Sequence, residues 1–409
     1  MALKTLTPKI SNHNIKAFLW HSGFLAFAQV FMDVDTVIPS MLIESGGTAF
    51  HIGLMTAIMV GGSSFTQIFF APYLSNVPYK KGFLLAGINL RIFSLLALGL
   101  MLFYLNGHHS FSLLWLIFIL ITIFSLSGAF ANISYIDITG KSILQEKRKT
   151  FFSARQIISG SIVLASAFLA RKVLTLADYP VNYSYMFFIG GTLLLIASFG
   201  FWSIKEVTPS VLRIKGISHF LRVMRTELKE NKKLIYFLGF INTQGVAISF
   251  MPFVVLYAKN VLGAAGSDTG NFLIFKVMGV VSVSLLILAM SGKAKYRILL
   301  YLNVALSLTV VLSTYFITDV HLIKYLFILG GIVYSLYSIS MNGVMLEISG
   351  QENRALYAGF AGAGNILPAV FPLLGGSLIG LFGFKVFFLM FVVMILLSLW
   401  FIRKMDCKK

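Results

Sequence analysis

Charged residues are scarce in this chain, and acidic ones are scarcer still. Of its 409 residues 11% are charged, and only 14 residues are Asp or Glu. Soluble domains average about 25% charged residues, so this composition excludes an ordinary water-exposed surface. Cysteine is nearly absent as well: Cys407 stands alone, which excludes a disulfide framework within the chain.

Signatures of enzyme chemistry are also missing. The sequence has no metal-site spacing of histidine, cysteine or acidic residues, no nucleophile elbow and no phosphate-binding loop. We therefore expect no catalytic residues, no metal, no cofactor and no ATP-driven activity.

Apolar residues make up 58% of the chain, and the mean hydropathy is +0.88. A spanning helix needs about 20 mostly apolar residues. Twelve such runs are present, near residues 17–43, 51–74, 82–105, 111–136, 151–174, 183–204, 234–258, 270–291, 297–317, 323–348, 355–379 and 384–402. The sequence therefore predicts an all-α membrane protein with twelve transmembrane helices.

One long polar stretch divides the runs into two sets of six. This basic stretch, 205–233, joins an N-terminal half, 1–204, to a C-terminal half, 234–409. The fourth run ends in Asn132-Ile-Ser-Tyr-Ile-Asp-Ile-Thr-Gly, and the tenth ends in Asn342-Gly-Val-Met-Leu-Glu-Ile-Ser-Gly. A repeat at the same place in each half predicts two pseudo-symmetric halves, an architecture found in several transporters.

Lysine and arginine are unevenly divided between the two sides of the runs. With a cytoplasmic N-terminus, the inner segments hold 25 of the 33 basic residues and the outer loops hold five. Basic residues favour the cytoplasmic side, so both termini are expected inside. This distribution accounts for most of the net charge of +19 without a nucleic-acid partner. The basic N-terminus also fits a signal peptide, but the first apolar run continues to Ile43, which favours a spanning helix.

The runs, the basic central stretch and the two halves resemble the major facilitator superfamily over nearly the whole chain. In that superfamily an acid followed by an arginine marks the inner ends of helices four and ten; here Asp137 precedes a basic cluster and Glu347 precedes Arg354. The superfamily motif Gly-x-x-x-Asp-Arg-x-Gly-Arg-Arg is degenerate, because Ser75 and Asn76 stand at its Asp-Arg positions. The resemblance implies a transporter, and the degenerate motif speaks against the drug–proton antiporter branch.

Ionisable residues inside spanning helices are candidates for function, because each costs at least about 2.5 kcal/mol at a helix centre. On the first predicted helix Gln29 and Asp33 share a stripe with His21, while Asp35 lies on another side. The resemblance implies that this helix lines the central cavity, where Asp33 or Asp35 would carry a proton or pair with a cationic substrate. A salt bridge at an outer gate is the alternative.

Two basic residues inside the predicted helices need partners or water. Arg91, near the middle of the third helix, is expected to be paired, either with an anionic group or with Asp33 or Asp35. Lys276, in the outer third of the eighth helix, is expected to extend its ammonium to the outer headgroups.

Neutral polar residues near mid-depth are candidates for binding a polar organic solute, since amides both donate and accept hydrogen bonds. They are Asn242 and Gln244 on the seventh helix, Tyr334 and Tyr337 on the tenth, and Asn365 on the eleventh. Hydrogen bonding between helices is the alternative role.

A cytoplasmic gate is predicted at the inner ends of the helices, with ion pairs that form and break as the cavity changes sides. Its expected members are Asp137, Arg155, Glu347 and Arg354. Loop anchoring and helix capping are the alternative.

We expect a secondary active transporter that moves a small polar or amphipathic solute by alternating access, with proton-coupled uptake. Its partners would be that solute, protons and the lipid bilayer, and a monomer in a bacterial cytoplasmic (inner) membrane is expected. Segments 35–39 and 151–156 resemble a bacterial group within the superfamily. Two alternatives stay open: proton-driven efflux of a drug- or siderophore-like compound, and a non-transporting or lipid-handling membrane protein on the same scaffold.

Overall fold

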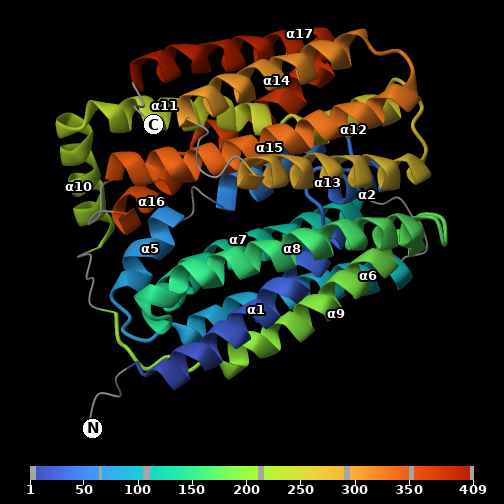
Figure 1. Cartoon of the computed structure of the whole chain (residues 1–409). Helices are drawn as coiled ribbons and strands as arrows, with labels where there is room; N and C mark the ends of the chain where they lie inside the picture. Colours follow the sequence, from blue (N-terminus) through green and yellow to red (C-terminus); the bar gives the residue numbers. More distant parts are fainter. Residues whose placement is uncertain are drawn as a thin grey trace. The chain divides into compact units, whose positions relative to one another are not determined.

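The computed structural model describes residues 6–63, 67–104, 111–210, 216–289, 295–349 and 354–405, and most of these residues are helical. Figure 1 shows the helices along the chain. They are α1 (Pro8–Phe31), α2 (Val37–Glu44), α3 (Ala49–Thr56), the π-helix η1 (Ala57–Gly62), α5 (Gln67–Ser75), α6 (Lys81–Tyr104), α7 (Phe111–Ser142), α8 (Gln145–Leu174), α9 (Val181–Ser203), α10 (Ile217–Glu230), α11 (Lys232–Ile248), α12 (Met251–Asn260), α13 (Gly266–Ala289), α14 (Tyr296–Phe316), α15 (Val320–Ser349), α16 (Arg354–Ala363) and α17 (Leu367–Met405).

Nine helices in the described part of the chain are long and apolar enough to cross a membrane. Lipid offers no hydrogen-bonding partners, so the backbone must satisfy its own N–H and C=O groups inside helices or closed barrels. The long apolar runs accordingly form helices, and the described ranges contain no strand. The expected all-helical membrane class is confirmed.

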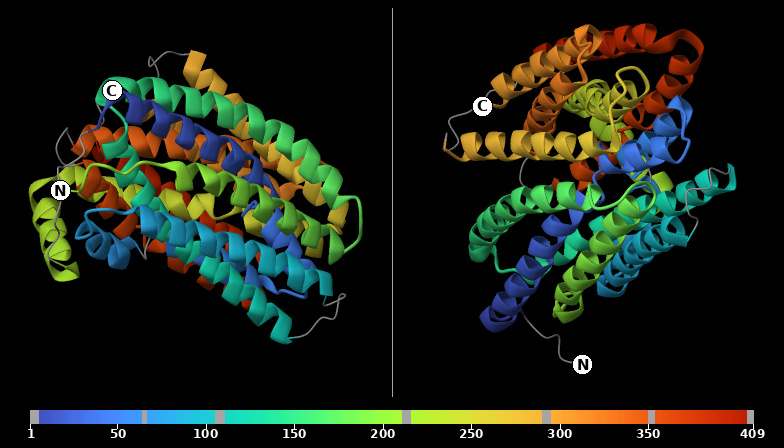
Figure 2. Two further views of the ribbon diagram at one scale, coloured as in Figure 1. Left: turned by 90° about the horizontal axis from the view of Figure 1, so that it is seen from below. Right: turned by 90° about the vertical axis from the view of Figure 1, so that its right-hand side faces the viewer.

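The helices divide into two units by their internal contacts. Unit 1 holds Met1–Met32 and Thr66–Leu221, and unit 2 holds Asp33–Phe65 and Arg222–Lys409. In unit 1, α1 packs on α8 and α9, and α6 packs on α7 and α9; Figure 2 shows these helices running alongside one another. In unit 2, α15 packs on α13 and α14, while α17 packs on α3, α11 and α14.

Short breaks interrupt the apolar segments between α1 and α2, between α11 and α12, and between α16 and α17. Each helix that follows a break has a proline among its first three residues: Pro39, Pro252 and Pro368. An N–H in the first turn has no helical partner anyway, so proline fits there and not inside a continuing helix. A further bend occurs inside α17, where Gly383 has a φ of 75°.

The break after α1 corrects the expectation of one continuous first helix over residues 17–43. Gln29 lies on α1, whereas Asp33 and Asp35 lie in the non-helical link 32–36. The reason is local: Asp33 accepts hydrogen bonds from the backbone N–H of Asp35 at 3.0 Å and from the hydroxyl of Thr36 at 2.8 Å. Such bonds compete with those of a helix, so Gln29 and Asp33 do not share a helical stripe.

Glycines bring α13 and α15 into close contact within unit 2. A Cβ at Gly331 would overlap the backbone carbonyl of Lys276, and one at Gly279 would overlap that of Ile328. Membrane helices pack through such small residues because their backbones can approach closely. This contact fixes the position of Lys276 along the axis of α15.

We expect Gly331→Ala to lower the melting temperature of the purified protein, because the added methyl group meets backbone that cannot move aside. Overpacking of this kind costs about 1–3 kcal/mol. Gly380→Ala is the matched control, since a Cβ at Gly380 has open space around it. Equal melting temperatures of the two variants in a thermal-shift assay would contradict the packing role of Gly331.

Candidate substrate and proton site

A buried triad of charged residues lies at the break between α1 and α2. The Lys276 ammonium is 2.5 Å from a carboxylate oxygen of Asp33 and 2.6 Å from one of Asp35. None of the three side chains is more than 15% exposed. The link 32–36 supplies both acids, and α13 supplies the lysine.

The two carboxylate oxygens of Asp33 have different roles. Oδ1 accepts the bonds from Asp35 and Thr36 that shape the link, and Oδ2 faces Lys276. Asp33 therefore builds the turn that presents Asp35 to the same ammonium.

Two further contacts hold α2 in place beside the triad. The hydroxyls of Ser40 on α2 and Thr269 on α13 lie 2.5 Å apart. Glu44, at the end of α2, forms an ion pair with Lys259 of α12. The link and α2 are thus attached to the helix that carries Lys276 and to α12.

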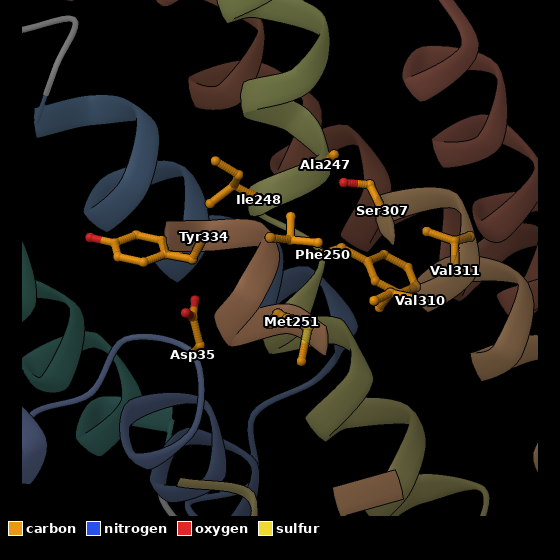
Figure 3. A pocket seen from close by; sticks show the side chains of 11 residues that line it. Asp35, Ala247, Ile248, Phe250, Met251, Ser307, Val310, Val311 and Tyr334 are labelled. Atoms are coloured by element: carbon orange, nitrogen blue, oxygen red, sulfur yellow. The ribbon is translucent and has the colours of Figure 1, made fainter. Parts of the chain in front are cut away.

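Asp35 also lines a small cavity in unit 2, together with Tyr334 and mostly apolar residues (Figure 3). In the close-up Asp35 lies on the same side of the cavity as Tyr334, while Val310 and Val311 lie on the opposite side. The cavity has room for about one water molecule. A larger solute therefore needs a change of conformation to reach Asp35.

The charges of the triad do not balance. Two ionised carboxylates facing one ammonium leave one negative charge. The ring centroid of Tyr334 lies 5.9 Å from the Lys276 nitrogen and adds a cation–π contact but no charge. An uncompensated buried charge is costly, so the triad favours a proton or a cationic group.

The prediction that the Lys276 ammonium extends to the outer headgroups is wrong. The side chain is 10% exposed and is bound by two acids. Matching the acidic and basic residues within the predicted helices would have indicated this pairing. The eighth apolar run carries a lone lysine, and the end of the first run carries Asp33 and Asp35 without a basic neighbour.

Arg91 lies in unit 1, with its guanidinium carbon 4.2 Å from the ring centroid of Phe124. Its Nε is buried and has no hydrogen-bond partner among the described residues. The contact with the aromatic face offsets part of the cost of burying the charge. Asp33 and Asp35, two of the partners considered for Arg91, are bound to Lys276.

Asn242 spans the break between α16 and α17. Its Nδ2 donates to the carbonyl of Gly364 at 2.6 Å, and its Oδ1 accepts from the backbone N–H groups of Ile366 and Leu367 at 3.0 and 2.9 Å. These backbone groups have lost their helical partners at the break. In this conformation the Asn242 amide is used by the protein itself.

Gln244 is fully buried in a polar network between helices. Its amide nitrogen lies 2.5 Å from Oδ1 of Asn303 and 2.7 Å from the hydroxyl of Ser307, both on α14. Its amide oxygen accepts from Ser398 at 3.3 Å. Gln244 thus joins α11 to α14 and α17.

Tyr337 and Asn365 lie together at Gly245. A Cβ built at Gly245 would be 3.3 Å from both the Tyr337 hydroxyl and the Asn365 Oδ1. This Oδ1 is buried and has no hydrogen-bond partner in the described ranges. Tyr334 is 48% exposed, and Gln29 is exposed on α1.

Asp137 belongs to a cluster of ion pairs in unit 1. Its carboxylate lies 3.0 Å from the Lys80 ammonium and 2.9 Å from that of Lys141, and it accepts the hydroxyl of Ser210 at 2.7 Å. The other expected gate residues have different surroundings. Arg155 lies 5.4 Å from the ring centroid of Tyr135.

The two gate candidates of the second half lie in unit 2. Glu347 is exposed near the end of α15. The side chain of Arg354, at the start of α16, lies outside the described residues.

Glu206 is a member of the Asp137 cluster that the sequence did not single out. Its carboxylate accepts the backbone N–H groups of Lys80 and Lys81, each at 2.7 Å, and lies 2.7 Å from the ammonium of Lys141. It therefore occupies the N-terminus of α6, where a negative charge is favoured. Burial lowers the pKa of the Lys80 ammonium, while Asp137 and Glu206 act to raise it. Nothing local in the polar stretch after α9 marks Glu206.

The sequence profile of the Major Facilitator Superfamily matches residues 19–365. The chain belongs to this superfamily. Comparison with curated proteins finds no significant match.

Solved transporter structures share the fold. The nucleoside transporter NupG aligns with a TM-score of 0.69 at 13% identity, over 96% of this chain and 100% of that one. A POT family transporter in complex with a thioalcohol-conjugated peptide aligns at 0.67 and 12% identity, over 96% of each chain. An inward-facing bacterial homologue of the human lysosomal transporter Spinster aligns at 0.65 and 10% identity, over 98% of this chain and 97% of that one.

We expect Lys276→Met to destabilise the protein by about 3–5 kcal/mol, because removing one partner leaves buried carboxylates without compensation. Adding Asp33→Asn and Asp35→Asn should recover much of this loss, since the amide at position 33 can still accept the turn hydrogen bonds. Thermal unfolding of the single and triple variants in detergent measures both effects. A triple variant less stable than Lys276→Met would show that unpaired carboxylates do not cause the destabilisation by Lys276→Met.

Proposed function

We propose that the protein is a proton-coupled secondary transporter that moves a small polar or amphipathic solute by alternating access. The observation that carries this proposal is the triad of Asp33, Asp35 and Lys276 beside a small cavity. Fully ionised, the triad has one net negative charge in a buried site, and a proton neutralises it.

Protonation would couple to solute binding through Lys276. In the ionised triad both acids hold the ammonium, and a proton on Asp35 leaves Asp33 as its sole charged partner. The weaker restraint allows the link 32–36 to move away from α13, and the cavity beside Tyr334 widens. Alternating access then presents the site to each side of the membrane in turn. Tyr337 and Asn365 are the polar groups we assign to contact with the solute.

We further propose twelve spans, with both termini in the cytoplasm of a bacterium. The 39 residues of α17 amount to about 58 Å of helix, against a hydrocarbon core of about 30 Å. The bend at Gly383 accordingly divides α17 into two spans. The pairs α1 with α2 and α11 with α12 each form one span, as do α3, η1 and α5 together. The basic linker 205–233 then joins two six-span halves of a monomer that works in uptake.

Cysteine labelling tests this topology, because Cys407→Ser removes the single native thiol. In that background we introduce Tyr79→Cys between α5 and α6, or Leu176→Cys between α8 and α9; both positions are exposed. An impermeant maleimide added to intact cells should label position 176 and leave position 79 unlabelled until the cells are opened. Labelling of position 79 in intact cells would contradict the proposed orientation and place this loop outside the cytoplasm.

Proton coupling is tested in proteoliposomes that contain a pH-sensitive dye. Pools of nucleosides, short peptides and other small metabolites are added, and a transported solute should change the lumenal pH with the wild-type protein. Asp35→Asn should reduce this change at least tenfold, because an amide of the same size takes up no proton in place of the carboxylate.

Glu44→Gln is the matched control, since it neutralises another ion-paired acid of unit 2 that does not line the cavity. It should keep most of the solute-dependent pH change. A comparable pH change with Asp35→Asn would remove Asp35 from the coupling mechanism. A solute that enters without any change of lumenal pH would exclude proton coupling.

A further inference from the structure

A second recess lies in unit 1. It is an open groove of about 240 Å³ between α1 and α9. Its lining residues are His13, Lys16, Ala17, Trp20, Phe199, Gly200 and Ser203. The helices meet closely at Gly200, where a Cβ would overlap the backbone carbonyl of Ala17. The groove therefore follows a tight helix contact on the exposed side of two apolar helices.

One part of the groove is cationic. Lys16 is exposed and makes no ion pair or hydrogen bond within the described ranges. His13 lies one turn before it, and its Nε2 is 2.8 Å from the carbonyl oxygen of Ser203, which fixes the ring at the groove. None of the lining residues is acidic. A positive charge beside a groove without a neutralising acid is complementary to an anion.

The other part of the groove is aromatic. Trp20 is 48% exposed and Phe199 is 54% exposed. The Trp20 indole N–H donates to the carbonyl of Ile196 at 2.9 Å, so the ring is held in place, and it packs on Phe24 at 4.7 Å between centroids. Trp20 lies one helical turn beyond Lys16, about 6 Å along α1. Tryptophan and lysine at this spacing match the level at which lipid headgroups give way to acyl chains.

We propose that this groove binds one anionic phospholipid. Its phosphate contacts Lys16 with His13 beside it, and its glycerol and upper acyl chains lie against Trp20 and Phe199. The charge of Lys16 selects an anionic headgroup over a zwitterionic one, and the aromatic part selects a lipid over a soluble anion. The groove shares no residue with the triad, and the proposal does not depend on which solute is transported.

The test uses the full-length protein in detergent and counts bound lipids by native mass spectrometry during titration with phosphatidylglycerol or phosphatidylcholine. We expect retention of phosphatidylglycerol at sub-stoichiometric lipid and little retention of phosphatidylcholine. Lys16→Ala should weaken the binding about fivefold, which corresponds to about 1 kcal/mol for one basic residue at a membrane surface. Lys16→Arg should restore it.

Lys404→Ala is the matched control, because it removes one exposed positive charge at the end of α17, outside the groove. It should bind phosphatidylglycerol as the wild type does. Equal losses in Lys16→Ala and Lys404→Ala would overturn the proposal in favour of diffuse surface charge. Equal retention of phosphatidylcholine would overturn the selection of an anionic headgroup. Displacement of the lipid by millimolar glycerol phosphate would overturn the lipid assignment in favour of a soluble anion.

Discussion

An ammonium inside an apolar helix bundle is stable only beside opposite charge, and Lys276 meets this requirement with two carboxylates from one short link. Residues two apart on a helix point to different sides, so Asp33 and Asp35 reach the same lysine only because the link is not helical. Asp33 makes this possible, since one of its oxygens holds the turn while the other faces the ammonium. The ion pairs, the break between α1 and α2 and the cavity beside Asp35 therefore depend on one another, because Asp33 and Asp35 take part in all three.

Breaks in membrane helices leave N–H and C=O groups that lipid cannot satisfy. In this protein a polar side chain bonds to the backbone at each break: Asp33 after α1, Ser249 after α11 and Asn242 at the start of α17. Asp33 and Asn242 were both singled out as possible contacts for a substrate, and both are occupied by the protein's own backbone. These hydrogen bonds therefore hold the ends of the interrupted helices in place.

Features that depend on composition along the chain were predictable from the sequence. The apolar runs formed helices, and these runs, the basic central stretch and the two similar halves indicated the superfamily. Features that depend on helix rotation and depth were not predictable, because Asp33 and Lys276 are 243 residues apart and neither run indicates which side faces the other. The break at 32–36 was missed because apolar residues continue across it, and a single side-chain acceptor makes the turn. Asn242 and Gln244 were recognised as polar groups at depth, but their partners on α17 and α14 depend on the folded bundle.

The degenerate loop before α6 shows how a charge can be supplied from a distant part of the chain. Ser75 and Asn76 stand where the superfamily motif has an acid and an arginine, and the carboxylate at the start of α6 comes from Glu206, beyond α9. The contact is reciprocal: the Lys81 ammonium donates to the carbonyls of Trp202 and Ile204 at 2.6 and 2.8 Å, at the end of α9. An acid at a helix N-terminus and a base at a helix C-terminus are the favoured placements of charge, so each helix neutralises the other. Lys80 and Lys141 also form ion pairs with Asp137 on α7, so charged contacts connect the ends of α6, α7 and α9. If α9 moved away from α6, both helix ends would lose the groups that cap them.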